Sequence, residues 1–105
     1  MRVLQLIASQ AFAGSEQSVL TLCKGLRERG HEVWLAASDG PNRERFLAEG
    51  LRVVGPPLRD WRAAFPLRQI IRREKIEILH AHLTRAVNIG LLASLLSGRP
   101  LVAHA

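Results

Sequence analysis

Three histidines stand where an imidazole could do chemistry. His80 and His82 are one residue apart, so both side chains point to the same side of an extended strand. A His-x-His pair can ligate zinc, but the other candidate ligands lack the usual spacing, so we expect no metal and interpret the pair as polar strand-end residues. His104 follows another apolar run, where an imidazole could donate a hydrogen bond to a ligand or exchange a proton near neutral pH. The position of His104 in the sequence is, by itself, also typical of an ordinary surface histidine.

A loop of small residues could bind phosphate. The segment 9–16 leads from an apolar run into a helix, and the N–H groups of a first helical turn favour an anion. Gly14 would let a ligand approach the backbone closely, although a plain strand-to-helix turn also uses such a residue. The loop holds no G-x-G-x-x-G fingerprint and the chain holds no G-K-[ST], so the dinucleotide-binding and P-loop interpretations lose support.

The elements that must position these residues follow from hydrophobic periodicity. Short apolar runs alternate with segments whose apolar residues recur at helical spacing. The expected strands are Val3–Ala8, Glu32–Ala37, Leu51–Val54, Ile76–Leu79 and Leu101–Ala103, with helices between them. This alternation predicts a doubly wound parallel α/β sheet, Rossmann-like with about five strands. In such sheets ligands bind beyond the carboxyl ends of the strands, where the residues above are expected.

Three local predictions concern the helices. Asn42 is expected to cap a short helix over Arg43–Glu49, because its side chain can accept from a first-turn N–H. Residues 58–65 are expected to be irregular, with Pro66 in the first turn of the following helix. In the first helix, the apolar positions 19, 22, 23 and 26 predict that Cys23 is buried, and Gly30 is expected to end that helix in a left-handed conformation.

Composition indicates one globular domain. The chain has 105 residues, of which 48% are hydrophobic and 23% are charged. The apolar stretch Ile89–Leu96 is far shorter than the ~18 to 20 residues that span a bilayer, and the N-terminus lacks a secretory cleavage pattern. These features predict a cytoplasmic protein.

The net charge of +6 favours contact with anions. Of the 15 basic residues 13 are arginine, but they form no run, and five aromatic residues offer little for stacking on bases. Nucleic-acid binding is therefore disfavoured, and a solvated basic surface accounts for the charge.

The sequence lacks the motifs that identify several other functional classes. No serine lies in a G-x-S-x-G elbow, and no two carboxylates converge. A receiver-like domain should place acidic residues after its first and third strands, where Ser9-Gln10 and Gly55-Pro56 stand. A dinucleotide-binding fragment should show the glycine fingerprint, which this chain lacks. Asp39 does lie near the end of the second strand, where such a fragment has an acidic residue. A non-catalytic α/β binding module stays as the alternative to an enzyme.

Five segments taken in order resemble one known family. They are Met1–Leu4, Ala13–Glu16, Leu26–Val33, Ile76–His82 and Pro100–His104. The set resembles the N-terminal domain of a family 4 retaining glycosyltransferase of the GT-B fold, and the resemblance covers essentially the whole chain.

The resemblance implies a role for several strand-end residues. Relatives of this kind transfer a sugar from a nucleotide-diphosphate sugar, a co-substrate, to a glycan, lipid-linked or small-molecule acceptor, with no metal or other cofactor expected. Gly14 and Ser15 match the donor phosphate-binding turn, but Ala13 stands where the family has a first glycine. His104 matches the histidine that contacts the donor sugar near the reacting centre. Residues at the positions that border the acceptor are His80, His82, Thr84 and Arg85.

The same resemblance implies that residues 1–105 are a truncated, acceptor-side Rossmann-like domain, the incomplete N-terminal half of a GT-B fold. Similar enzymes bind the nucleotide sugar in a C-terminal domain that carries an E-x7-E pair, and no two glutamates here have that spacing. We expect this domain to be missing, the fragment alone to transfer no sugar, and apolar surface on the last helix and strand to be left uncovered.

A second hypothesis concerns the membrane. The helix expected over Leu67–Lys75 carries four cations beside Trp61 and Phe65, which suggests peripheral contact with anionic lipid at the inner face of the membrane. A solvated helix face is favoured, because the apolar residues of this helix are expected to pack on the sheet.

Overall fold

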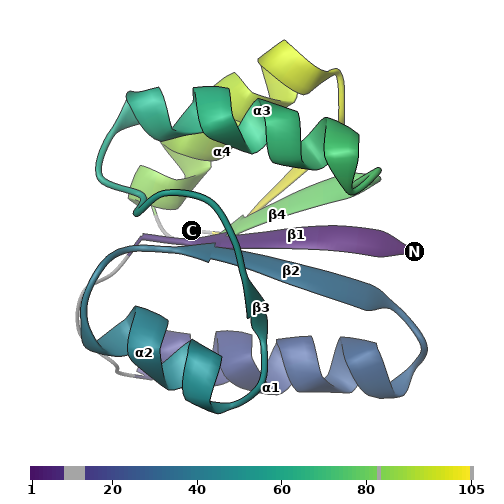
Figure 1. Ribbon diagram of the computed structural model, residues 1–105, viewed down its shortest axis with the longest axis vertical. Coiled ribbons are helices and arrows are strands. Elements are labelled where there is room, and N and C mark those ends of the chain that lie inside the picture. Colours follow the sequence, from purple (N-terminus) through teal and green to yellow (C-terminus); the bar gives the residue numbers. More distant parts are fainter. Residues whose placement is uncertain (9–13, 83, 105) are drawn as a thin grey trace.

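The computed structural model describes residues 1–8, 14–82 and 84–104. Five parallel strands form one sheet in the order β3-β2-β1-β4-β5 (Figure 1). The strands are β1 (Arg2–Ile7), β2 (Glu32–Ala37), β3 (Arg52–Val53), β4 (Ile78–His82) and β5 (Leu101–His104). The helices are α1 (Gly14–Glu28), α2 (Pro41–Ala48), the short 3₁₀ helix η1 (Trp61–Ala63), α3 (Ala64–Arg73) and α4 (Thr84–Ser97). The predicted doubly wound parallel α/β fold is confirmed.

Helices cover both faces of the sheet, with α1 and α2 on one face and α3 and α4 on the other (Figure 1). The central strand β1 is buried from Val3 to Ile7, because it has a neighbouring strand at each edge and helices above and below. A parallel strand in this position needs a nearly continuous apolar run, which is what the sequence has. Leu4 and Leu6 point toward α3 and α4, whereas Ile7 points toward α1.

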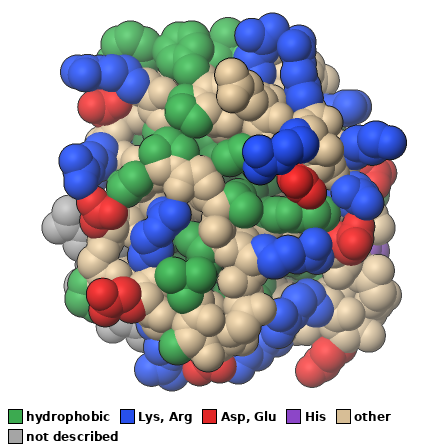
Figure 2. Space-filling view, viewed as in Figure 1, with side chains coloured by type: hydrophobic (Ala, Val, Ile, Leu, Met, Phe, Trp, Pro, Cys, Tyr) green, Lys and Arg blue, Asp and Glu red, His purple; other side chains and the backbone are tan. Residues whose placement is uncertain are grey.

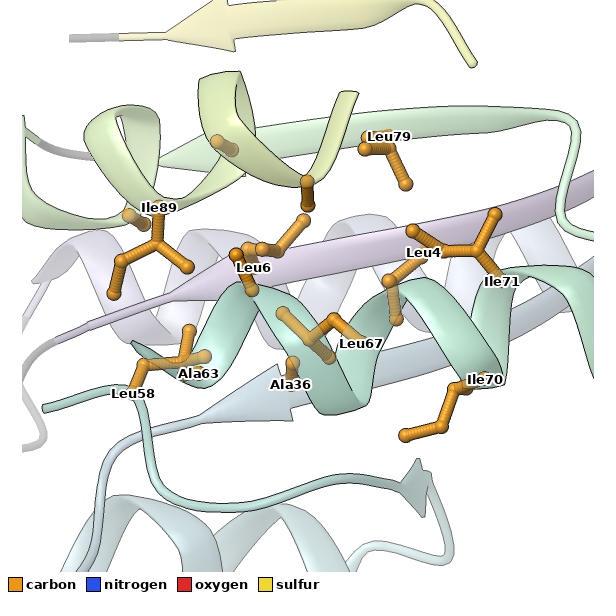
Figure 3. Close-up of a cluster of buried hydrophobic side chains, with 14 of the residues drawn as sticks. Leu4, Leu6, Ala36, Leu58, Ala63, Leu67, Ile70, Ile71, Leu79 and Ile89 are labelled. Atoms are coloured by element: carbon orange, nitrogen blue, oxygen red, sulfur yellow. The ribbon is translucent and has the colours of Figure 1, made fainter. Parts of the chain in front are cut away.

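The larger core cluster fills the space between the sheet and the α3/α4 layer. Figure 3 shows Leu6 of β1 facing Leu67 of α3 and Ile89 of α4. These three side chains are almost completely buried, and removing each from water contributes about 1.5–3 kcal/mol. A smaller cluster on the opposite face includes Phe46 of α2 and Leu20 of α1. The two clusters hold one helical layer on each face.

The start of α2 differs from the prediction. Gly40 precedes the helix and Pro41 is its first residue, so Asn42 lies inside the first turn, where it is fully buried, and does not cap the helix. Proline fits a first helical position because its ring fixes φ and its missing N–H would have no partner there.

The segment before α3 is also more regular than predicted. The side chain of Asp60 accepts a hydrogen bond from the backbone N–H of Arg62 at 2.9 Å, which starts η1, and η1 continues directly into α3. Pro66 is therefore the third residue of α3, where a missing N–H leaves no helical carbonyl without its donor. β4 begins and ends later than expected, at Ile78 and His82.

Both α1 and α3 end through a left-handed residue. Gly30 follows α1 with a φ of 90°, as predicted. After α3 the same role falls to Lys75, whose φ is 54°, the one positive value at a non-glycine position among the described residues. The N–H of Ile76 donates to the carbonyl of Ile71 at 2.9 Å, the hydrogen bond of a Schellman motif.

Candidate functional site

The strand order places a candidate site at the carboxyl ends of β1 and β4. These neighbouring strands pair in register from Val3 with Ile78 to Ile7 with His82. The helix that follows β1 packs on one face of the sheet, and the helix that follows β4 packs on the other (Figure 1). Ligands of open α/β sheets bind where successive connections diverge in this way.

His80 and His82 lie on one face of β4, as their spacing predicted. They alternate with Leu79 and Ala81, which pack toward α3 and α4, so the imidazoles point to the α1 side of the sheet. Their ring centroids are 4.1 Å apart, with a tilt of 41° between the planes. His82 is buried and His80 is half-buried.

A buried glutamine orients one of these rings. Gln5 lies in the middle of β1, fully buried, and its Oε1 is 2.7 Å from Nε2 of His82. Because an amide oxygen only accepts, Nε2 of His82 carries a proton and donates it. Nε2 of Gln5 is buried and makes no hydrogen bond to the described residues. The pair holds an imidazole with a defined donor atom close to the strand ends.

Gln5 was not predicted from the sequence to be a site residue. The available signal was one polar side chain within a run that a central parallel strand would bury on both faces. A buried amide needs a polar partner, so this position alone could have indicated a contact with a neighbouring strand.

Gly14 and Ser15 form the first turn of α1, which begins at Gly14. The first N–H groups of a helix have no acceptor within it and lie at the positive end of its dipole. The phosphate-binding role of these backbone donors stays a prediction. Ala13 and the rest of segment 9–13 fall outside the described residues.

The remaining predicted residues lie at the same edge of the sheet. His104 is the last residue of β5 and is paired in register with His82. Thr84 is the first residue of α4, and the exposed Arg85 follows it. The structure thus brings the predicted donor-side and acceptor-side positions together at the carboxyl ends of β1, β4 and β5.

The segment after β3 crosses the carboxyl end of β2. The guanidinium of Arg43 donates to the carbonyl of Ala37 at 3.2 Å and to that of Gly55 at 2.8 Å. The N–H of Leu58 also donates to the Ala37 carbonyl, at 3.1 Å. These bonds hold residues 55–58 over the strand ends and so extend the candidate site toward α3.

This segment frames a hollow of about 360 Å³, a size within the range of small-molecule sites. Its lining residues are Pro56, Pro57, Arg59, Asp60, Arg62, Ala63 and Pro66. Arg59 forms an ion pair with Asp39 of the loop after β2, and this hydrogen bond raises the pKa of the guanidinium above its usual value. None of these lining residues was predicted from the sequence to belong to a site.

Other chemistry is sparse in the described part of the chain. Among residues 1–8, 14–82 and 84–104, no three His, Cys, Asp or Glu side chains group as metal ligands. Across the same residues, no helix combines the length and apolarity needed to cross a membrane. Cys23 is buried in α1 as predicted, and burial raises the pKa of its thiol to about 12.

Several solved structures share this fold. A glycosyltransferase from Rickettsia africae ESF-5 aligns with a TM-score of 0.80 and 16% identity, over 97% of this chain and 28% of that chain. Acinetobacter baumannii MurG aligns with a TM-score of 0.81 and 16% identity, over 99% and 35%. Anabaena Alr3699/HepE in complex with UDP aligns with a TM-score of 0.79 and 21% identity, over 99% of this chain and 29% of that chain. The chain spans about a third of the length of these proteins, and the likeness shows the fold they share.

Sequence comparison identifies the family. A search of curated proteins finds no match. The profile of Glycosyltransferase Family 4 matches residues 12–105, a range that runs from just before α1 through β5 and includes every predicted site residue. The five ordered segments, the doubly wound sheet and this match agree, and the chain belongs to Glycosyltransferase Family 4.

Proposed function

We propose that this chain is the N-terminal, acceptor-side domain of a retaining glycosyltransferase of the hexosyltransferase type. The enzyme would transfer a sugar from a nucleoside diphosphate sugar to a glycan, lipid-linked or small-molecule acceptor, as a step of glycan biosynthesis in the cytoplasm. The family match over residues 12–105 is the observation that carries the proposal. The donor class is supported by the solved complexes of Alr3699/HepE with UDP-glucose and of VinC with DTDP.

Each part of the strand-end site has a proposed task. The first-turn N–H groups at Gly14 and Ser15 would donate to the donor's diphosphate and stabilise the negative charge that develops on it as it leaves. His104 would contact the donor sugar beside the reacting carbon and donate a hydrogen bond there. The acceptor would lie against His80, His82, Thr84 and Arg85, and the ring of His82 is oriented for this by Gln5.

The proposal divides the reaction between two domains. Residues 1–105 would supply the acceptor site and half of the donor cleft, while a C-terminal domain carrying the E-x7-E pair would bind the nucleotide. The 105-residue chain alone would therefore not transfer sugar. No resident metal or other cofactor is part of the proposal.

The direct test uses the full-length gene product. It is incubated with a panel of UDP- and dTDP-sugars and candidate acceptors, nucleoside diphosphate release is followed, and the anomeric configuration of the product is read by NMR. Transfer with retained configuration supports the proposal, and inversion contradicts its stereochemical part. Turnover by the 105-residue chain under the same conditions would contradict the division between domains.

Replacing His104 tests the site. We expect His104→Ala to lower kcat about 10²- to 10⁴-fold, the usual range for a group that acts on the reacting centre. The matched control is His31→Ala, because His31 precedes β2 at the opposite, amino edge of the sheet and should leave kcat unchanged. Equal losses in both variants would show that His104 has no special place in the reaction.

A further inference from the structure

The hollow before α3 has walls that are held in place without a ligand. Its lining includes Pro56, Pro57 and Pro66, and each proline ring fixes a backbone φ. The guanidinium of Arg43 and the N–H of Leu58 bond the segment to the carboxyl end of β2. A wall that is fixed beforehand loses little conformational entropy when a ligand binds, which is the property of a preformed site.

The polar side chains of the hollow carry balanced charge. Arg59 is paired with Asp39, and Nε of Arg62 lies 3.8 Å from Oδ1 of Asp60. These four side chains are 45% to 76% exposed, so a ligand can reach them. Figure 2 shows blue and red side chains next to one another along its left side, over the start of α3 and the segment before it. An anionic ligand would meet carboxylates here, whereas a neutral ligand with hydroxyl groups would meet donors and acceptors side by side.

An apolar wall accompanies these polar groups. The three prolines and Ala63 line the same hollow as Arg59, Asp60 and Arg62. A sugar ring has CH groups on its faces and hydroxyl groups around its rim, and each hydroxyl both donates and accepts hydrogen bonds. Guanidinium groups donate to such hydroxyls and carboxylates accept from them. The volume of about 360 Å³ is near the lower end for small-molecule sites, which suits a short saccharide better than a long chain.

We propose that this hollow binds a neutral sugar unit of the acceptor, so that the acceptor is a glycan of at least two units. The inference rests on the proposed function and selects one of its three acceptor classes. The hollow adjoins the acceptor-side residues, because η1 contacts α4, whose first residues are Thr84 and Arg85. One sugar unit would present its hydroxyl group at the strand ends, and the next unit would lie in the hollow.

The hollow is separate from the exposed surface at the other edge of the sheet. The chain enters the hollow from β3, and β3 and β5 are the two opposite edge strands.

Direct binding tests the assignment without requiring turnover. The full-length gene product is applied to an array of neutral, uronate-bearing and phosphorylated di- and trisaccharides, and affinities for the bound ones are measured by titration calorimetry. Neutral saccharides should bind, and their anionic counterparts should bind more weakly. Equal or tighter binding of the anionic saccharides would overturn the proposal, as would a lack of binding to every neutral one.

A matched pair of arginines tests the residues of the hollow. Arg62→Ala should weaken binding of the tightest neutral saccharide about tenfold, the usual effect of a lost hydrogen bond. Arg45→Ala removes an arginine from another exposed ion pair, with Glu49 at 3.4 Å, and should leave the affinity unchanged. Equal affinities of the two variants would contradict the assignment.

Asp60→Asn tests the charge balance. The amide oxygen of asparagine can still accept from the N–H of Arg62, so η1 should keep its start while one negative charge is lost. The variant should bind uronate-bearing saccharides about fivefold more tightly than the unsubstituted protein does, because a nearby like charge is removed. An unchanged preference would show that the carboxylate does not exclude anions.

Transfer assays separate this inference from the proposed function. Arg62→Ala should raise KM for a disaccharide acceptor about tenfold more than KM for a monosaccharide acceptor, which lacks the second unit. Equal rises in KM would overturn the subsite and leave the transferase assignment intact. Binding of neutral saccharides without any transfer would contradict the proposed function and leave the hollow as a glycan-binding site.

Discussion

At the scale of single residues, the thiol of Cys23 links stability to alkaline pH. Burial raises its pKa from 9.0 to about 12, so above pH 9 the unfolded chain loses this proton while the folded chain keeps it. The unfolded state therefore binds fewer protons, and the free energy of unfolding should fall by about 1.4 kcal/mol per pH unit between the two pKa values. Urea unfolding over this pH range measures the slope. Cys23→Ala should lack this contribution, and an unchanged slope would contradict it.

Lys75 is a position where a substitution is expected to raise the free energy of unfolding. Its φ of 54° disfavours any residue with a Cβ, so Lys75→Gly should stabilise the fold by about 0.5–1 kcal/mol. Arg72→Gly, one turn earlier in the helix, should instead destabilise it by about 1 kcal/mol. Chemical denaturation of the two variants decides the point, because a loss of stability in both would mean that the left-handed residue carries no strain.

The candidate site was predictable where spacing along one strand was sufficient. Side chains alternate between the two faces of a strand, so His80 and His82 lie on one face even when the ends of the strand are predicted incorrectly. The structure confirms this. The Gln5 contact was not predictable in the same way, because it joins residues 77 positions apart. Such a partner depends on which strands are neighbours, and strand order is set by packing of the whole sheet.

At the scale of elements, Gly55 controls the turn between β3 and η1. Its φ is 77°, and an added Cβ would lie 3.2 Å from side-chain atoms of both Leu67 and Ile70. Gly55→Ala should therefore destabilise the protein by about 1–3 kcal/mol through backbone strain and crowding. Gly25→Ala in α1, where a Cβ meets nothing within 4 Å, should stabilise it by about 0.5–1 kcal/mol. Thermal or urea unfolding of the pair gives the comparison, and equal effects would contradict it.

The order of elements was predictable because each helix and strand has its own periodicity, but helix starts were not. The start of α2 depends on competition between Pro41 and Asn42 for the first turn, and proline prevails. The start of α3 depends on Asp60, whose side chain begins η1 upstream of Pro66. Small free-energy differences decide such local competition, and hydrophobic periodicity does not predict them.

At the scale of the whole molecule, the sheet separates two core clusters. Phe46 belongs to the cluster under α1 and α2, and Leu67 to the cluster under α3 and α4. Phe46→Ala should cost about 3–5 kcal/mol and Leu67→Ala about 2–5 kcal/mol. Because the residues belong to separate clusters on opposite faces of the sheet, the double variant should lose their sum within about 0.5 kcal/mol. A larger deviation in urea unfolding would show that the sheet transmits repacking from one face to the other.

The family was predictable because five short segments, taken in order, resemble its N-terminal domain, and the family profile matches residues 12–105. Residues 59–75 and 84–99 hold eight Lys and Arg but two Asp and Glu, and the linear sequence does not show that the two segments lie on one face of the molecule. This arrangement becomes apparent only when the winding of the chain assigns α3 and α4 to one face.

The central place of β1 also governs how the chain folds during its synthesis. Val3 pairs with Val33 on one side and with Ile78 on the other, so β1 completes its pairing only after β4 has been made. At ~5–20 residues per second, an open edge persists for several seconds on the ribosome. An apolar strand with unpaired N–H and C=O groups can add to the sheet of another nascent chain. The rate of translation between β2 and β4 therefore sets how long this protein is exposed to mispairing.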